Sequence, residues 1–195
     1  MTEKLQNYLI ENFIAFMIVF SMAYVMTWVG TGTFEDGGEI VLSHYLYLPL
    51  GAKILMYLLF GYRVFPGVIA ACLVGGVVLM NSWNGHFFIG MLSACAGAIA
   101  PIVAMCIMKQ TRVSNFSNLA RVDFRHVLFL IVFTSVISAL LKFFVYTQDL
   151  TLNINAVTFI THYITGDVLG GLVVIYLTLH VIVPILKGFF PQKSI

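Results

Sequence analysis

Three ionisable side chains interrupt the apolar runs of this sequence: Lys53, Lys142 and Asp167. A charge inside an apolar segment that crosses a membrane is costly unless it faces the protein interior or water. Such residues therefore mark candidate functional positions. Counted along their segments at about 1.5 Å per helical residue, Lys53 and Asp167 fall at similar middle depth. The sequence therefore predicts that these two side chains can form a pair.

Three interpretations of these charges stay open. The first is an ion pair between Lys53 and Asp167 that neutralises two buried charges and fixes the helix register. The second is a polar floor beneath an outward-facing cavity, where Lys53 and Lys142 meet an anionic or carbonyl-bearing ligand. The third is a proton relay through Asp167 and His162. Lys142 lies only about one helical turn from the outer end of its segment, so we expect it to snorkel outward.

The second interpretation predicts a ligand pocket in the outer half of the molecule. Small-molecule sites are mostly apolar, with a few convergent polar groups. If Asp167 neutralises Lys53, Lys142 remains as an uncompensated cation, which favours a neutral or weakly anionic ligand. The predicted pocket is lined by Tyr47, Lys53, Lys142, His162, Thr165 and Asp167.

The other chemistry-bearing residues form no pattern that indicates catalysis or metal binding. The histidines scatter over different segments without the spacing of a metal motif. The serines in the apolar runs have no base at a suggestive spacing. The cysteines lie in apolar runs without paired spacing, which predicts neither a disulfide framework nor a zinc site. We therefore expect no catalytic residue, no metal, no cofactor and no nucleic-acid partner.

Composition identifies the elements that must position these residues. The chain is 61% hydrophobic and 9% charged, whereas a soluble domain is nearer a quarter charged. This indicates an all-α polytopic protein of the lipid bilayer, with residues 1–195 as a single membrane domain. Runs of about 20 apolar residues leave room for about six spans with short loops. The predicted spans are residues 13–28, 46–60, 66–80, 87–108, 127–146 and 156–186.

The distribution of lysine and arginine predicts the orientation of these spans. The loops at 31–44, 81–86 and 147–155 contain neither residue. Basic residues gather in the segments on the other side, and cytoplasmic loops of membrane proteins carry this excess. We therefore expect both termini in the cytoplasm.

The second and third predicted spans carry a group of small and helix-breaking residues. Pro49 and Gly51 stand where a regular span should begin, which predicts an irregular start. Arg63 lies in a tight turn, and Pro66 is tolerated because it falls in the first turn of the next helix. Gly67 begins a series of small residues at four-residue spacing, which allows close helix approach.

Glycines also flank the acidic residue of the last span. Gly166 precedes Asp167 directly, and Gly170 follows one turn later. Two interpretations remain open: simple small-residue packing between helices, or local unwinding of the span beside a cavity.

Two of these stretches resemble the MASE1 membrane sensor module. Residues 48–51 (L-P-L-G) and 58–67 (L-L-F-G-Y-R-V-F-P-G) resemble its L-P-x-G helix start and its L-x-F-G-x-R-x-W-P-G element. Phe65 stands where the family often has tryptophan. Residues 166–170 (G-D-V-L-G) resemble the G-D-x-L-G element of its last span. The resemblance covers roughly residues 13–186.

The resemblance implies a sensory or ligand-binding module of a bacterial inner membrane, without catalysis of its own. Such modules usually precede a diguanylate cyclase, a cyclic-di-GMP phosphodiesterase or a histidine kinase. We therefore expect a cytoplasmic signalling partner or a homodimer. More distantly, the chain is similar to the substrate-binding subunits of energy-coupling-factor importers, and the alternative function is binding a small nutrient for import.

Overall fold

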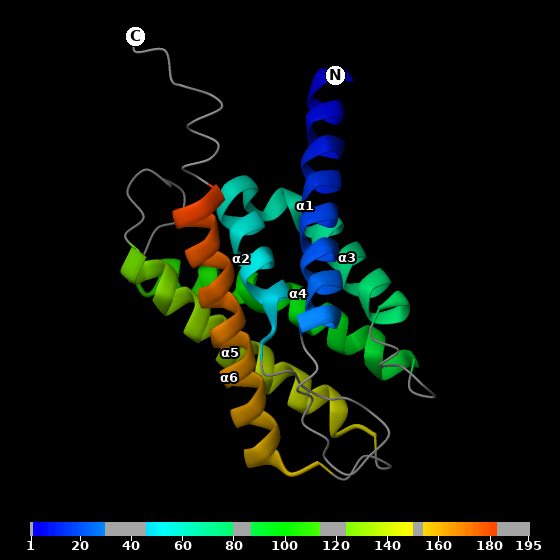
Figure 1. Ribbon diagram of the computed structural model, residues 1–195, viewed down its shortest axis with the longest axis vertical. Coiled ribbons are helices and arrows are strands. Elements are labelled where there is room, and N and C mark those ends of the chain that lie inside the picture. Colours follow the sequence, from blue (N-terminus) through cyan, green and yellow to red (C-terminus); the bar gives the residue numbers. More distant parts are fainter. Residues whose placement is uncertain (1, 30–45, 80–86, 114–123, 150–153, 183–195) are drawn as a thin grey trace.

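The computed structural model describes residues 2–29, 46–79, 87–113, 124–149 and 154–182, and its elements there are helices (Figure 1). The all-α prediction is confirmed. The loops at 31–44 and 81–86, and most of 147–155, lie outside the described residues. The elements are α1 (Thr2–Val29), α2 (Leu48–Phe60), the 3₁₀ turn η1 (Gly61–Val64), α3 (Phe65–Val78), α4 (Phe87–Gln110), α5 (Phe124–Tyr146), α6 (Ala156–Leu177) and the π-helical turn η3 (Thr178–Ile182).

The helix boundaries depart from the predicted spans at both ends of the chain. Helix α1 begins at Thr2, although the predicted span begins at residue 13. Helix α6 ends at Leu177 and passes into η3, whereas the predicted span extends to residue 186, and its last residues lie outside the described part of the chain. The physical reason at α1 is that hydropathy marks the apolar core of a span, while a helix can continue into the polar interface.

Within the described residues, five segments are long and apolar enough to cross a membrane, so this is a multi-pass membrane protein. One of them, Leu48–Val78, contains both α2 and α3. These helices have 13 and 14 residues, and each is about 20 Å long, which is shorter than an ordinary span. The chain reverses direction between them at η1 (Figure 1). The count of six spans therefore stays a prediction.

Gly61 ends α2 and makes this reversal possible. Its φ is 71° and its ψ is −161°, a backbone region essentially restricted to glycine. The chain then forms η1 and enters α3, with Pro66 in the first turn as the sequence predicts. Gly61 therefore explains why one apolar segment of 31 residues folds as two antiparallel helices.

The first turn of α1 and the last turn of η3 lie at the same end of the molecule (Figure 1). Basic residues of the described chain stand at helix ends that gather there: Lys4, Arg63, Lys109, Arg112 and Arg125. We name this the cationic end. The predicted orientation requires such a grouping, although the side of the membrane that it faces stays a prediction.

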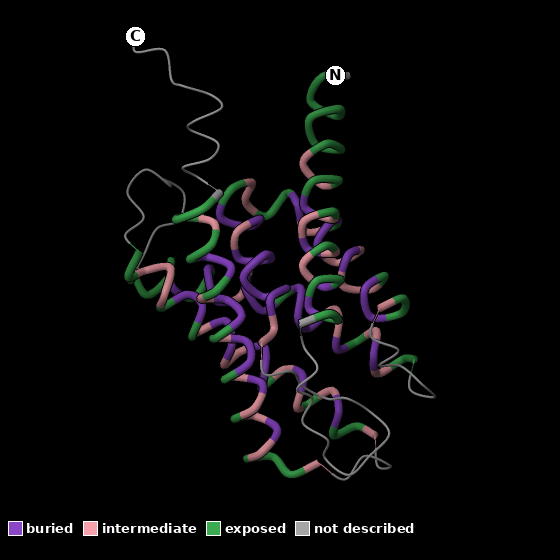
Figure 2. The backbone as a smooth tube through the Cα atoms, viewed as in Figure 1, coloured by how far each residue is buried: buried purple, intermediate pink, exposed green. Residues whose placement is uncertain are grey.

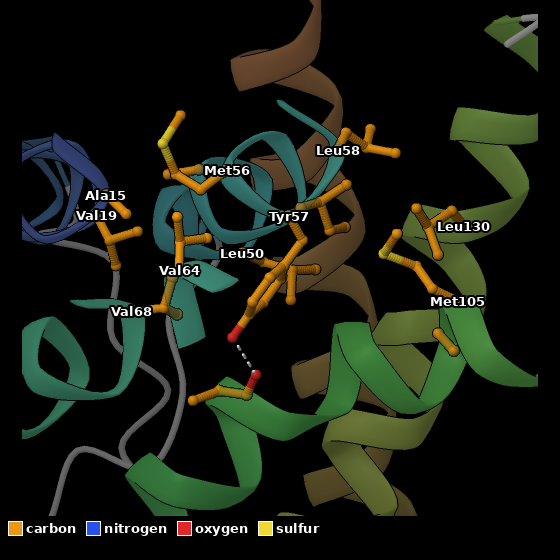
Figure 3. Close-up of a cluster of buried hydrophobic side chains, with 14 of the residues drawn as sticks. Ala15, Val19, Leu50, Met56, Tyr57, Leu58, Val64, Val68, Met105 and Leu130 are labelled. Carbon is orange, nitrogen blue, oxygen red and sulfur yellow. Dashed lines mark hydrogen bonds between the residues drawn. The ribbon is translucent and has the colours of Figure 1, made fainter. Parts of the chain in front are cut away.

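Helix α2 is the centre of the bundle. Ten of its 13 residues are buried, and it forms a purple core between the other helices (Figure 2). Leu50 and Tyr57 pack with Val64, Met105 and Leu130 in the main hydrophobic cluster (Figure 3). Side chains that α2 presents therefore meet protein rather than lipid, which is the condition that a charge at position 53 requires.

Asn12 of α1 fixes the start of α3. Its Oδ1 accepts a hydrogen bond of 2.8 Å from the Gly67 N–H, one of the N–H groups that has no partner in the first turn of a helix. Its Nδ2 donates to the Arg63 carbonyl at 3.1 Å. A Cβ on Gly67 would overlap the Asn12 carbonyl. One side chain of α1 therefore caps α3, and only glycine permits the approach.

A single added methyl group tests this contact. We expect Gly67→Ala to destabilise the protein by about 2 kcal/mol or more, because the new Cβ meets rigid backbone. Gly75→Ala is the matched control, since a Cβ there would contact only the Ala23 Cβ at 3.7 Å. The measurement is thermal unfolding of both variants in detergent. Equal melting temperatures for the two variants would contradict the Asn12–Gly67 contact.

Candidate functional site

The site begins with a carbonyl group that has no partner in its own helix. Pro101 lies inside α4, and because proline has no N–H, the carbonyl four residues earlier loses its helical hydrogen bond. That carbonyl belongs to Gly97. The Lys53 Nζ of α2 donates to it at 3.2 Å, and only 1% of Lys53 is exposed. The buried ammonium and the free carbonyl therefore satisfy each other.

Tyr57 repeats this arrangement one turn further along α2. Its hydroxyl donates to the Ala98 carbonyl at 2.9 Å, and 1% of its surface is exposed (Figure 3). Residues four apart lie on one face of a helix. Lys53 and Tyr57 therefore join the same face of α2 to consecutive carbonyls of α4.

Lys142 of α5 points inward, which corrects the expectation that it snorkels outward. Only 5% of its surface is exposed. A Cβ on Gly97 would lie 3.4 Å from the Lys53 Nζ and 3.9 Å from the Lys142 Nζ. The two ammonium groups therefore converge on the bare surface that glycine leaves at position 97. Outward snorkelling would remove Lys142 from its aromatic neighbours in the interior.

Tyr47 lies beside both lysines. The Lys53 Nζ lies 5.2 Å and the Lys142 Nζ 4.8 Å from the centre of its ring. Tyr163 of α6 holds the Lys142 Nζ at 4.5 Å from its own ring. Cations are attracted to the faces of aromatic rings, and the attraction increases away from water. The two tyrosines therefore stabilise the converging ammonium groups.

The backbone of Tyr47 is held against α6. Its N–H donates to the Gly166 carbonyl at 2.9 Å, and a Cβ on Gly170 would overlap its backbone. A Cβ on Gly51 would likewise lie 2.6 Å from the Val174 Cβ. Tyr47 is not helical. The two glycine-containing stretches of the sequence therefore meet, and their glycines allow the irregular start of α2 to lie directly on α6.

Asp167 is buried without a hydrogen-bond partner. Only 1% of its surface is exposed, and neither carboxylate oxygen accepts a hydrogen bond. The predicted direct pair with Lys53 therefore has no hydrogen bond between the two groups, and the Lys53 ammonium donates to the Gly97 carbonyl. Both lysines attract this carboxylate electrostatically, Lys142 more strongly than Lys53, and Ser138 of α5 faces it.

The structure does not bring every predicted pocket residue into this group. Thr165 is exposed, and its hydroxyl donates to the Thr161 carbonyl at 2.7 Å within α6. His162 is half-buried. At about 100° per residue, His162 and Thr165 point about 140° and 160° away from Asp167 around the helix. Tyr163, one turn before Asp167, lies on the same face of α6 as Asp167. Helical periodicity alone predicts this placement.

We name Tyr47, Lys53, Lys142 and Asp167 the charge cluster. Next to it, toward the end opposite the cationic end, Phe159 packs between Tyr146 and Tyr163, with ring centroids 5.7 and 4.5 Å apart. This aromatic group lies at the end of α5 and the start of α6. It separates the charge cluster from that end of the bundle.

The charge cluster has the chemistry of a binding site. It holds two ammonium groups against one carboxylate, all in the interior. Its tyrosine rings, amines and carboxylate provide charge and hydrogen bonds for a ligand. Within the described residues, no group of three His, Cys, Asp or Glu side chains is placed to hold a metal ion.

A comparison with models of known protein families matches the MASE1 family over residues 9–193, nearly the whole chain. No curated protein and no solved structure matches it. The resemblance of the two glycine-containing stretches to MASE1 is thereby confirmed, whereas the similarity to importer subunits is not shown.

Removing the single carboxylate tests the electrostatics of the cluster. We expect Asp167→Asn to destabilise the protein by about 3 kcal/mol, because it leaves two buried ammonium groups without a counter-charge. Adding Lys142→Met should recover part of this loss, and adding Lys109→Met, at an exposed position, should recover none. Thermal unfolding in detergent measures all three. A Lys142→Met double variant no more stable than Asp167→Asn alone would show that Asp167 and Lys142 are not coupled.

Proposed function

Since the chain belongs to the MASE1 family of membrane-associated sensory domains, we propose that it senses a small molecule at the charge cluster. The proposed location is the bacterial inner membrane, with the cationic end in the cytoplasm. The response passes to a cytoplasmic signalling protein or to a second copy of the chain. The family is sensory rather than catalytic, and the proposed module has no catalysis of its own.

One observation carries this proposal: α6 joins the charge cluster to the cationic end. The helix continues from Asp167 to Leu177 and passes into η3. A ligand that changes the balance of charge at Asp167 therefore acts on an element that reaches the end where the basic residues gather (Figure 1). Signals of this kind travel as shifts of a rigid helix at a packed interface.

The close contacts of α6 couple it to the residues around the charge cluster. Gly170 lies against the Tyr47 backbone, and a Cβ on Gly171 would lie 2.8 Å from the Ile131 Cγ2 of α5. A movement of Tyr47 or Lys142 must therefore displace α6 or be resisted by it. Packed interfaces of this kind favour discrete arrangements over gradual deformation.

The π-helical turn η3 is the element through which we propose that the signal leaves the helix bundle. The Thr178 hydroxyl donates to the Val174 carbonyl at 2.8 Å, and the His180 ring stacks on Tyr176 at 4.3 Å between centroids. π-Helical turns occur frequently at functional sites. Such a turn contains one residue more than an α-helical turn, so a shift of the hydrogen-bond register can convert one into the other. A register change in η3 would turn the chain that follows α6.

A reporter fusion tests the sensory function in the intact chain. A diguanylate cyclase domain is joined after Ile195, and its product is measured in cells that contain equal amounts of membrane-inserted protein. We expect Lys142→Met to change the output by about fivefold or more, the lower end of coupling between sites in proteins. Leu92→Met, at an exposed position of α4 outside the charge cluster and the cationic end, should leave it unchanged. Unchanged output with both Lys142→Met and Asp167→Asn would contradict the proposal.

A further inference from the structure

We infer that the charge cluster is a binding site for a small monovalent anion, either a halide or the carboxylate of a small organic acid. The inference names the chemical class of the ligand in the proposed function. The claim that this anion is sensed rests on that function. Binding itself is argued from the cluster alone.

The first argument is the charge of the cluster. Lys53 and Lys142 are 1% and 5% exposed, and Asp167 is the carboxylate that faces them. The tyrosines whose rings lie against the two ammonium groups, Tyr47 and Tyr163, carry uncharged phenol groups. One positive charge therefore remains inside a bundle that crosses the membrane, where an unpaired charge is costly. One monovalent anion balances it.

The second argument is the ammonium of Lys142. The Lys142 Nζ lies 4.8 and 4.5 Å from the centres of the Tyr47 and Tyr163 rings, and the nearby carboxylate of Asp167 accepts no hydrogen bond from it. Lys53 differs, because it donates to the Gly97 carbonyl. A buried ammonium has three protons to donate, and leaving them unused is unfavourable. A bound anion would accept them.

The third argument is that one small ion can reach both lysines. The position of a Cβ on Gly97 is 3.4 Å from the Lys53 Nζ and 3.9 Å from the Lys142 Nζ. The two Nζ atoms therefore lie no more than 7.3 Å apart, the sum of these two distances. Charge-assisted N–H···O bonds are about 2.8 Å long, so one small anion between the two ammonium groups needs only small shifts to contact both. Gly97 has no side chain to oppose it. A β-branched residue at position 97 would fill the same space.

The start of α2 adds to the positive potential. Helix α2 begins at Leu48, beside Tyr47, and Tyr47 lies against the middle of α6 rather than beyond its end. The N-terminus of a helix carries about half a positive charge and attracts anions. In several transporters a helix that begins inside the membrane holds an anionic group in this way. Lys142 and the start of α2 therefore both favour a negatively charged ligand.

The test uses the purified full-length chain in detergent at fixed pH and fixed ionic strength. Sodium gluconate, whose bulky polyhydroxy anion serves as the reference, is replaced stepwise by chloride, bromide or acetate. We expect the melting temperature to rise and to saturate with the small anions. Lys142→Met should weaken the apparent affinity about tenfold or more, as for the loss of a charge-assisted hydrogen bond. Lys142→Arg should keep the saturable response, and Lys109→Met should behave as the unchanged protein.

Two results would overturn the inference. The first is a melting temperature of the unchanged protein that does not depend on the small anions. The second is a Lys142→Met variant that keeps the same saturable response. A response to halides, to acetate or to both supports the anion site and identifies the source of the ligand. If the anion binds but the reporter output is the same with Lys142→Met, the sensory function is rejected. The anion-binding site is then still supported.

Discussion

Pro101 interrupts the hydrogen bonding of α4 inside the membrane, and Lys53 of α2 restores it at the Gly97 carbonyl. An unpaired carbonyl and an unpaired ammonium would each be strongly unfavourable in a hydrocarbon environment. Together they form a hydrogen bond that joins the most buried helix to α4. This constraint shapes the rest of the site, because it holds the Lys53 ammonium at the Gly97 carbonyl, while Asp167, which accepts no hydrogen bond, acts on both lysines electrostatically.

The glycine contacts set the geometry around this bond. Gly170 and Gly51 bring α2 and α6 so close that Tyr47, which precedes α2, lies on the middle of α6. Its ring then lies within reach of both ammonium groups. Irregular backbone at this depth is tolerated where it is buried in protein or lines a polar site. The stretches that resemble the MASE1 motifs are therefore the stretches that bring the charge cluster together.

Several of these features could be predicted from the sequence. Hydropathy identified the helical membrane fold, and the charges within apolar runs identified Lys53 and Asp167 as interior residues. The broken segment around Gly61 was recognisable from its glycines and prolines. Helical periodicity would also have placed Tyr163, rather than His162 or Thr165, beside Asp167.

Other features depend on tertiary contacts that no local pattern contains. The sequence shows Pro101 as a helix-breaking residue, but not which side chain meets the carbonyl that it frees. Lys142 lies near the end of α5, where a lysine ordinarily extends to water. It turns inward because Gly97, Tyr47 and Tyr163, from three other parts of the chain, surround it. Asn12 caps α3 across 55 residues, a separation at which sequence patterns carry no information.

The central claim is that Lys53 satisfies the carbonyl that Pro101 leaves free, and a double-mutant cycle between these residues tests it most directly. Pro101→Ala restores an N–H that can bind the Gly97 carbonyl, so Lys53→Met should destabilise the protein by about 1–2 kcal/mol less in that background. The loss of the lysine charge is common to both backgrounds and cancels. Asn12→Ala, on α1, should have the same effect with either residue at position 101. An equal effect of Lys53→Met in both backgrounds would contradict the account.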